Sequence, residues 1–183
     1  MLKETSNDFD TGGDKPLLPV DDVRKIMKMI LSGVSHIHAN RIVHRDLKPG
    51  NIVFYNQNGK LNLKIIDFGC ALELNKVKSS ESGILIGTPA FMAPEIFQEK
   101  GSIDCYREAV DVWACGIIMY SMLTAEVPFY SQDSVEMIQM IKTDVVNLEG
   151  RRTLSNVPDS AKSLLRLMLN RNVRERIKAA DCL

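Results

Sequence analysis

Residues 42–54, IVHRDLKPGNIVF, crowd five chemically versatile polar side chains into eight positions, with apolar residues at both ends. These side chains are His44, Arg45, Asp46, Lys48 and Asn51. A carboxylate can accept or orient a proton, and an ammonium group can neutralise negative charge. Taken singly, Asp46 could cap a turn and Asn51 could hydrogen-bond to loop backbone. Taken together, the five residues predict a functional loop.

Regular elements flank this loop and would fix the directions of its side chains. Before it, apolar residues at steps of three and four predict an amphipathic helix, with Asp21 or Asp22 as N-cap and an end near Asn40. After it, Ile52–Tyr55 and Leu61–Ile66 have the composition of strands. The Asn-Gly pair between them favours a hairpin turn.

The rest of the chain is predicted to be mainly helical. Residues 1–20 are interpreted as a flexible N-terminal segment rich in turn residues, and residues 70–92 show no clear element. Val110–Tyr120 is apolar nearly all round, which predicts a deeply buried helix. Further helices are predicted at Ser134–Lys142, at Ser160–Leu169 and from Lys178 to Leu183.

The composition excludes several classes of function. Of the 183 residues, 45% are hydrophobic and 25% are charged, as in soluble globular domains. Lysine plus arginine equals aspartate plus glutamate, 23 each, which argues against a general nucleic-acid binder. No apolar run approaches the roughly 18 residues of a membrane helix, and the first residues lack a signal-sequence core. We therefore expect neither nucleic acid nor a membrane as partner.

The four cysteines, Cys70, Cys105, Cys115 and Cys182, form no Cys-x-x-Cys pair and no zinc-type cluster with histidine. We interpret them as reduced thiols, mostly buried as small apolar residues. This usage predicts an intracellular, cytoplasmic protein.

Further motifs follow the first loop in a fixed order. The stretch His44–Asn51 is followed by Asp67–Gly69 at the end of the second strand, and then by Gly87–Glu95 (GTPAFMAPE). Asp111–Trp113 opens the buried helix, and Arg176 lies near the end of the chain. This order and spacing resembles the eukaryotic protein kinases over about residues 21–183.

The resemblance implies a phosphotransfer site that uses ATP and Mg²⁺. Asp46 would accept or orient the proton of the substrate hydroxyl, and Lys48 would neutralise charge on the moving phosphoryl group. Asn51 and Asp67 would ligate Mg²⁺, a hard cation that prefers oxygen. Val53 would close the adenine pocket from below. The resemblance thus implies three catalytic residues, Asp46, Lys48 and Asn51. The residues that would bind the cofactor are Lys48, Asn51, Val53 and Asp67. The metal ligands would be Asn51 and Asp67.

The resemblance also gives several residues structural roles near the site. His44 would pack against Phe68 and would take no part in proton transfer. Gly69 would permit the backbone turn that aims Asp67. His38, on the first helix, matches a position of the family that is also structural.

Further implied roles concern the base of the lobe and its regulation. Asp111 would hold from below the backbone of the catalytic loop, which is the stretch His44–Asn51. Glu95 would form a buried ion pair with Arg176. Arg45 resembles an arginine that pairs with a phosphate on the activation loop. The nearby candidates for phosphorylation are Ser79, Ser80 and Ser82, although ordinary loop serines are as good an interpretation.

The fold implied by the resemblance is the kinase-like α+β fold, as a mostly α-helical C-terminal lobe with a short β-hairpin. Residues 21–183 would form this partial kinase domain. The 183 residues contain no Gly-x-Gly-x-x-Gly strand turn and no Val-Ala-x-Lys strand, so we expect the small N-terminal β lobe to be absent. An apolar surface that this lobe covers in kinases would then lie open. Gly50 stands where the family commonly has glutamate or another polar residue, but this position does not ligate the metal.

The function implied is an ATP-dependent serine/threonine protein kinase, present as a catalytic lobe that is weak or inactive alone. Lys48 together with Thr88 resembles the serine/threonine class. Val127–Tyr130 and Val135–Ile138 most resemble calcium/calmodulin-dependent and calcium-dependent kinases. The implied partners are a protein substrate with serine or threonine, and a missing N-terminal lobe or a regulatory protein.

Two other functions remain open at this point. The first is a truncated kinase lobe that does not catalyse and instead acts as a protein-binding module. The second is a related small-molecule phosphotransferase, which ranks last because such enzymes generally lack the Ala93-Pro94-Glu95 segment.

Overall fold

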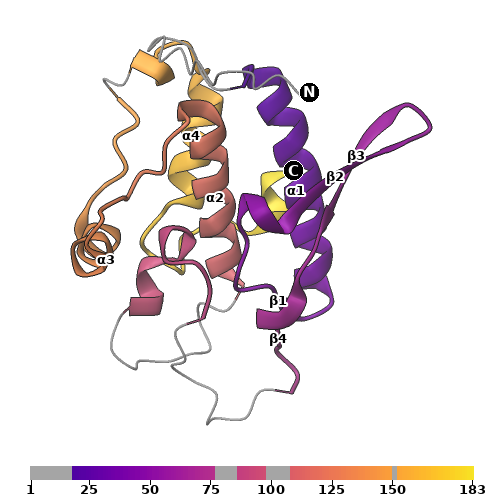
Figure 1. Ribbon diagram of the computed structural model, residues 1–183, viewed down its shortest axis with the longest axis horizontal. Coiled ribbons are helices and arrows are strands. Elements are labelled where there is room, and N and C mark those ends of the chain that lie inside the picture. Colours follow the sequence, from indigo (N-terminus) through magenta and orange to yellow (C-terminus); the bar gives the residue numbers. More distant parts are fainter. Residues whose placement is uncertain (1–17, 77–85, 98–107, 150–151) are drawn as a thin grey trace, which may run out of the picture.

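The computed structural model describes residues 18–76, 86–97, 108–149 and 152–183 (Figure 1). Within these ranges the four α-helices are α1 (Val20–Ala39), α2 (Ala109–Thr124), α3 (Ser134–Thr143) and α4 (Asp159–Met168). The strands are β1 (Ile42–Val43), β2 (Ile52–Gln57), β3 (Lys60–Ile65) and β4 (Leu72–Glu73). They form two antiparallel pairs, β1 with β4 and β2 with β3. The described residues thus form a helical body with little strand, as the kinase-lobe interpretation predicts.

Helix α1 buries one face and exposes the other, as its apolar spacing predicts. Its start differs from the prediction, because Pro19 occupies the N-cap position and no side chain caps the helix. The φ of −55° at Pro19 already suits entry into a helix. Asp21 and Asp22 instead lie in the first turn, where negative charge is favourable.

Helix α2 lies in the middle of the body and is buried nearly all round (Figure 1). Its largest fully buried side chains are Trp113 and Tyr120. Gly116 allows a close approach to the segment after α4, because a Cβ there would lie 2.7 Å from Leu169 Cδ2. The predicted burial of this helix is confirmed.

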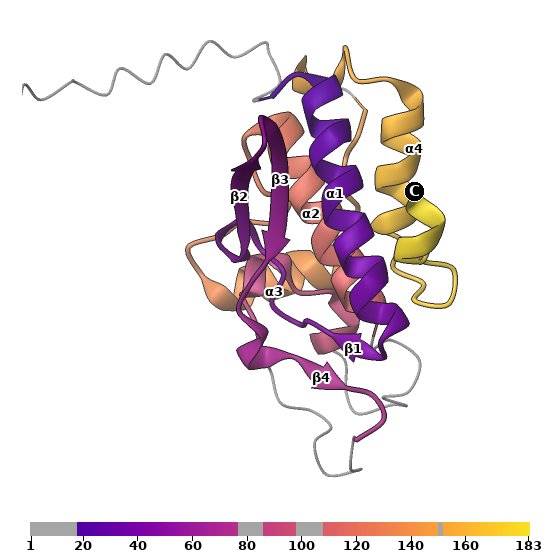
Figure 2. The same cartoon turned by 90° about the vertical axis from the view of Figure 1, so that its right-hand side faces the viewer.

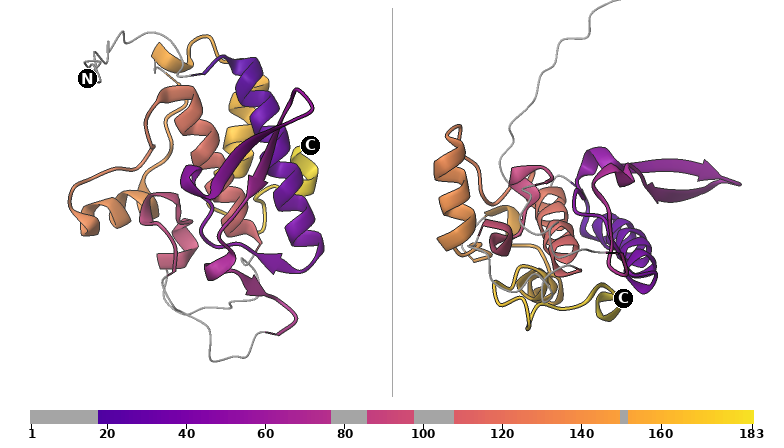
Figure 3. Two further views of the ribbon diagram at one scale, coloured as in Figure 1. Left: turned by 45° about the vertical axis from the view of Figure 1, so that its right-hand side comes forward. Right: turned by 90° about the horizontal axis from the view of Figure 1, so that it is seen from below.

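The β2–β3 hairpin turns at Asn58-Gly59, as predicted, with φ values of +53° and +78°. Its inner residues, including Ile65, pack on the core, and Gly33 of α1 leaves space for the Ile65 side chain. Towards its turn the hairpin extends away from the helices (Figure 3). The polar loop between β1 and β2 is therefore joined to α1 through β1 on one side and to the partly exposed hairpin on the other.

Three other features differ from the predictions or lie beyond them. The β1–β4 pair was not predicted, because two-residue strands carry no recognisable period. The last helix is only a short 3₁₀ segment, Ala179–Cys182. Residues 1–17, the three candidate serines and Cys105 lie outside the described residues, so the domain boundary at residue 20 stays a prediction. None of the described helices is long and apolar enough to cross a membrane.

Candidate active site

The loop between β1 and β2 is fixed from below by one buried carboxylate. Asp111, in the first turn of α2, is 1% exposed. Its Oδ2 accepts the backbone N–H of His44 at 2.8 Å, and its Oδ1 accepts that of Arg45 at 2.9 Å. His38 Nε2 lies 2.9 Å from Oδ2. The structural roles predicted for Asp111 and His38 are confirmed. The loop is held in place because its backbone is hydrogen-bonded to a residue of a buried helix.

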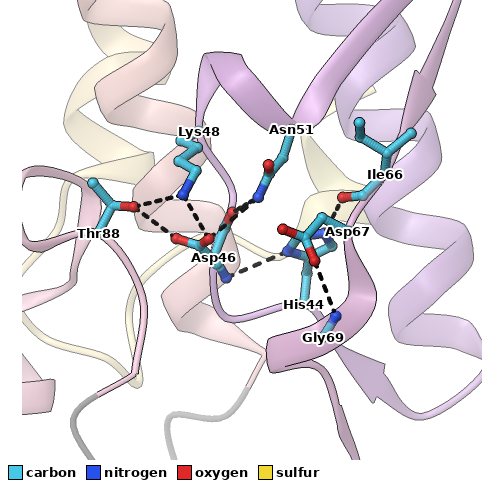
Figure 4. Close-up of polar contacts among 8 residues, drawn as sticks. All are labelled: His44, Asp46, Lys48, Asn51, Ile66, Asp67, Gly69 and Thr88. Carbon is cyan, nitrogen blue, oxygen red and sulfur yellow. Dashed lines mark hydrogen bonds and ion pairs between the residues drawn. The ribbon is translucent and has the colours of Figure 1, made fainter.

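The side chains of Asp46, Lys48 and Thr88 form a closed triangle of hydrogen bonds (Figure 4). Lys48 Nζ donates to Asp46 Oδ2 at 2.8 Å and to Thr88 Oγ1 at 2.9 Å. The Thr88 hydroxyl donates in turn to Asp46 Oδ1 at 2.9 Å. Thr88, 42 residues after Asp46 in the sequence, thus lies in direct contact with the candidate catalytic aspartate.

The charges in this triangle stabilise one another. Burial raises the pKa of Asp46, but hydrogen bonds from Lys48 and Thr88, the Lys48 charge and the Asn51 amide outweigh it, and the pKa is lowered overall. The pKa of Lys48 is raised, chiefly by its hydrogen bond to Asp46 and also by the charge of Asp67. At neutral pH the site therefore holds a carboxylate beside an ammonium group.

Asn51 is 5% exposed and oriented by Asp46. Its Nδ2 donates to the Asp46 carbonyl oxygen at 2.8 Å and to Asp46 Oδ2 at 3.3 Å. Both hydrogen bonds use the amide nitrogen, which leaves Oδ1 available as an acceptor or a metal ligand.

Asp67 lies across from this cluster on the turn that follows β3 (Figure 4). Its φ is +63°, a left-handed conformation that is rare for a residue with a side chain and that gathers at functional sites. Its Oδ1 accepts the N–H of Gly69 at 3.3 Å, and its second oxygen stays open. The turn was expected at Gly69, but the positive φ belongs to Asp67 itself. Gly69 instead supplies the N–H and the space that hold the carboxylate.

His44 supports this turn from the interior, as predicted. It is fully buried, and its Nε2 lies 3.0 Å from the carbonyl oxygen of Ile66. Its ring meets the Phe68 ring edge-on, with centroids 4.9 Å apart. Phe68, on the other side of this contact, remains 46% exposed as a residue.

Val53 and Arg45 are the other two residues to which the resemblance gave roles at the site. Val53 lies on β2, is 43% exposed and points to the hairpin face opposite Ile52, which packs on the core. Arg45 Nε donates to the Cys70 carbonyl oxygen at 2.6 Å, so this arginine ties the catalytic loop to the turn after Asp67. Its predicted pairing with a phosphoserine is untested, because the candidate serines lie outside the described residues.

Gly87 is a site residue that the sequence analysis did not single out. Its φ is +116°, and a Cβ there would lie 2.7 Å from the Arg45 carbonyl oxygen. Only glycine therefore lets the segment that carries Thr88 approach the catalytic loop. The position of this glycine directly before Thr88 was the available signal.

The end of the same segment is held by the predicted ion pair. Arg176 Nη1 and Nη2 donate to the two oxygens of Glu95 at 2.6 and 2.9 Å, and the two side chains are 0% and 5% exposed. Arg176 also donates to the Ala109 carbonyl oxygen and lies 5.0 Å from the Trp113 ring centroid. The pair joins the segment after Thr88 to the start of α2 and the C-terminal region.

The oxygen atoms that remain open have the donor chemistry of a magnesium site. Among the described residues no group of three or more His, Cys, Asp or Glu side chains could hold a metal. Asn51 and Asp67 offer one amide and one carboxylate oxygen, and Mg²⁺ commonly takes few protein ligands and keeps several waters. The donor chemistry suits a metal that a bound nucleotide helps to hold.

The fold and this arrangement define the large lobe of a protein kinase. The model of the protein kinase domain matches residues 3–183, and the chain belongs to the protein kinase family. Calcium-dependent protein kinase 3 of Plasmodium yoelii yoelii is 34% identical over 158 residues, which cover 86% of this chain and 28% of the relative. The delta subunit of calcium/calmodulin-dependent protein kinase type II of Oryctolagus cuniculus is 35% identical over 162 residues, or 88% of this chain and 29% of the relative. The chain thus spans under a third of these curated relatives, whose names confirm the resemblance to calcium-linked kinases.

Proposed function

We propose that this site transfers the γ-phosphate of ATP to the hydroxyl of serine or threonine in a protein substrate. The observation that carries the proposal is the bonded cluster of Asp46, Lys48 and Asn51, with Asp67 close enough to affect the pKa of Lys48. Phosphoryl transfer demands little covalent work from a protein, so positioned charge of this kind is the main requirement.

Asp46 is the residue that would orient the acceptor hydroxyl. Because its pKa is lowered, it is ionised at neutral pH and can accept a hydrogen bond from that hydroxyl. Thr88 already donates to Oδ1, but a carboxylate oxygen has two lone pairs and can accept a second donor. Thr88 would therefore lie next to the hydroxyl-bearing side chain of the substrate, as expected for a serine or threonine substrate.

Lys48, Asn51 and Asp67 would hold the phosphates and their metal. Lys48 presents its ammonium group at the Asp46 carboxylate, where the transferred phosphoryl group would lie. Asn51 Oδ1 and the open oxygen of Asp67 would ligate Mg²⁺, which when bound neutralises charge on the phosphates. Val53 would form the floor under the adenine.

We also propose that the 183-residue chain on its own catalyses phosphotransfer slowly and binds nucleotide weakly. Val53 and Phe68 are 43% and 46% exposed, so water reaches the side chains that would border a nucleotide. Electrostatic stabilisation of a phosphoryl group weakens where water is not excluded. A further lobe or a regulatory protein that covers these side chains would raise the activity.

We also propose that the protein is cytoplasmic, because its cysteines form none of the paired motifs of disulfide-rich or zinc-binding proteins.

The test is phosphotransfer from radiolabelled ATP to serine- and threonine-containing protein, with Mg²⁺-dependent ATP binding measured in parallel. We expect slow transfer that is lost in Asp46→Asn and in Asp67→Asn, with ATP binding in Mg²⁺ weakened only in Asp67→Asn. Asp21→Asn is the matched control, because Asp21 is exposed and remote from the cluster. Transfer or Mg²⁺-dependent binding that survives Asp67→Asn would contradict the proposal.

A second candidate is a binding module that does not catalyse, favoured by the exposed apolar side chains of the hairpin. It predicts no phosphotransfer above that of Asp46→Asn, even when a partner protein occupies the hairpin. The transfer assay therefore separates the two functions.

A further inference from the structure

A cavity of about 550 Å³ lies away from the candidate active site. Its walls come from the C-terminal end of α1, the residue after β4, the start of α2 and residues 173–178. This is the end of the molecule where α1 runs into β1 (Figure 2). None of Asp46, Lys48, Asn51 and Asp67 lines it. A volume of this size suits a small molecule or a single side chain of a partner.

Among the charged residues that line the cavity, positive charge predominates. Arg41, Arg174 and Lys178 contribute exposed cationic side chains, and Glu108 contributes the one acid among the lining residues. Arg41 Nη1 lies 3.2 Å from Glu108 Oε1, so this pair largely cancels. Arg174 and Lys178 have no side-chain partner among the described residues. Two cations therefore converge on the cavity without an acid to balance them.

The other polar lining residues are already engaged and do not cancel this excess. Arg176 is paired with Glu95, and His38 lies against Asp111. Ala109, the first residue of α2, also lines the cavity, and no side chain caps that helix end. The start of a helix carries partial positive charge, which adds to that of the two free cations, although Asp111 in the first turn of α2 offsets part of it.

We propose that this cavity binds a phosphate monoester. Such a group carries about −1.5 to −2 charge at neutral pH and three acceptor oxygens, which match two cationic side chains and a helix start better than a single carboxylate would. The phosphate could belong to a phosphorylated serine or threonine of a peptide or to a small phosphorylated metabolite. The two sources share the group that the cavity recognises.

The test is a titration of the purified chain with inorganic phosphate, O-phosphoserine and glucose 6-phosphate, followed by two-dimensional NMR. The double variant Arg174→Gln with Lys178→Gln should weaken binding about tenfold or more, because it removes two charge-assisted contacts. Glu108→Gln should tighten binding, because it removes the lining acid and frees Arg41. Neither Arg174 nor Lys178 makes another side-chain interaction in the described structure, so the thermal midpoint should not change.

Two further variants make the result specific. Lys142→Gln removes an exposed lysine of α3, outside the cavity, and should leave binding unchanged. Lys48→Gln removes the ammonium group of the candidate active site and should leave the phosphate-induced NMR shifts of the cavity residues unchanged. Tighter binding of O-phosphoserine indicates a peptide, and tighter binding of glucose 6-phosphate indicates a metabolite; both support the proposal. Absence of saturable binding, equal binding in all variants, or a loss only in Lys48→Gln would overturn it.

Discussion

The base of the catalytic loop and the hairpin above it are built in opposite ways. At the base, Asp111 and the Glu95–Arg176 pair are almost fully buried, and the oxygens of both carboxylates accept hydrogen bonds. On the hairpin and the turn after it, Val53 and Phe68 stay exposed. The difference shows that the chain by itself fixes the loop that carries Asp46. Under the proposed function, a covering lobe or partner would complete the nucleotide side.

This contrast separates stability from activity. Loss of a partner at the base leaves a buried charge unpaired, which is expensive. Changes to exposed apolar side chains have little effect on the free energy of unfolding. Variants at the base should therefore act on folding first, whereas variants on the hairpin should leave folding nearly unchanged.

The largest effect is expected for Arg176→Met. The variant strands Glu95 in the interior and should lower the free energy of unfolding by about 3–5 kcal/mol. Urea unfolding measures it, with Arg24→Met as the matched control, because the Arg24–Asp21 pair is exposed and worth about 0–1 kcal/mol. Equal losses in the two variants would mean that the buried pair does not hold the lobe together.

Gly87→Ala should come next, with a loss of about 1–3 kcal/mol or more, because a Cβ at φ +116° also meets the Arg45 carbonyl oxygen. Gly59→Ala is the control that isolates the contact. Gly59 also has a positive φ, +78°, but nothing lies within 4 Å of its Cβ position. Urea unfolding should rank Gly87→Ala as clearly the more damaging, and the reverse order would refute the close approach to the catalytic loop.

A smaller effect should appear as a pH dependence of Asp46. Its pKa in the folded protein is below the ordinary value of 3.8, so its charge stabilises the fold above about pH 3.8 and this contribution is lost as the pH falls through the folded value. The difference in unfolding free energy between the wild type and Asp46→Asn should shrink from neutral pH to about pH 3. A difference that stays constant over this range would show that the ion pair with Lys48 contributes no stability.

The smallest effect is expected on the hairpin. Leu61 is 58% exposed, so Leu61→Ser should change the unfolding free energy by no more than about 0.5 kcal/mol. Leu165→Ala in the buried face of α4 should cost about 2–5 kcal/mol in the same urea experiment. A large loss in Leu61→Ser would mean that the hairpin is integral to the core.

The site was more predictable than the connections around it. Asp46, Lys48 and Asn51 lie within one short loop, so any fold that fixes the loop brings them together. Asp111 was predictable only through the resemblance, because no local pattern links it to His44, 67 residues earlier.

The failures have local physical causes. Periodicity found α1 but placed its start on an aspartate, because a proline with suitable φ can begin a helix without a side-chain cap. Gly69 was expected to permit the backbone turn that aims Asp67, yet the positive φ belongs to Asp67, whose carboxylate accepts the Gly69 N–H. Tertiary contacts decide such details, and a single sequence does not display them.

The central claim is that Asn51 and Asp67 act on one metal ion beside Asp46. A double-mutant cycle on Mg²⁺-dependent ATP binding, measured by calorimetry for Asn51→Ala, Asp67→Asn and the double variant, tests it most directly. If both residues ligate the same ion, each single variant should remove most of the dependence on Mg²⁺, and the double variant should be little worse than either. Independent, additive losses, or no loss in either single variant, would contradict the shared site.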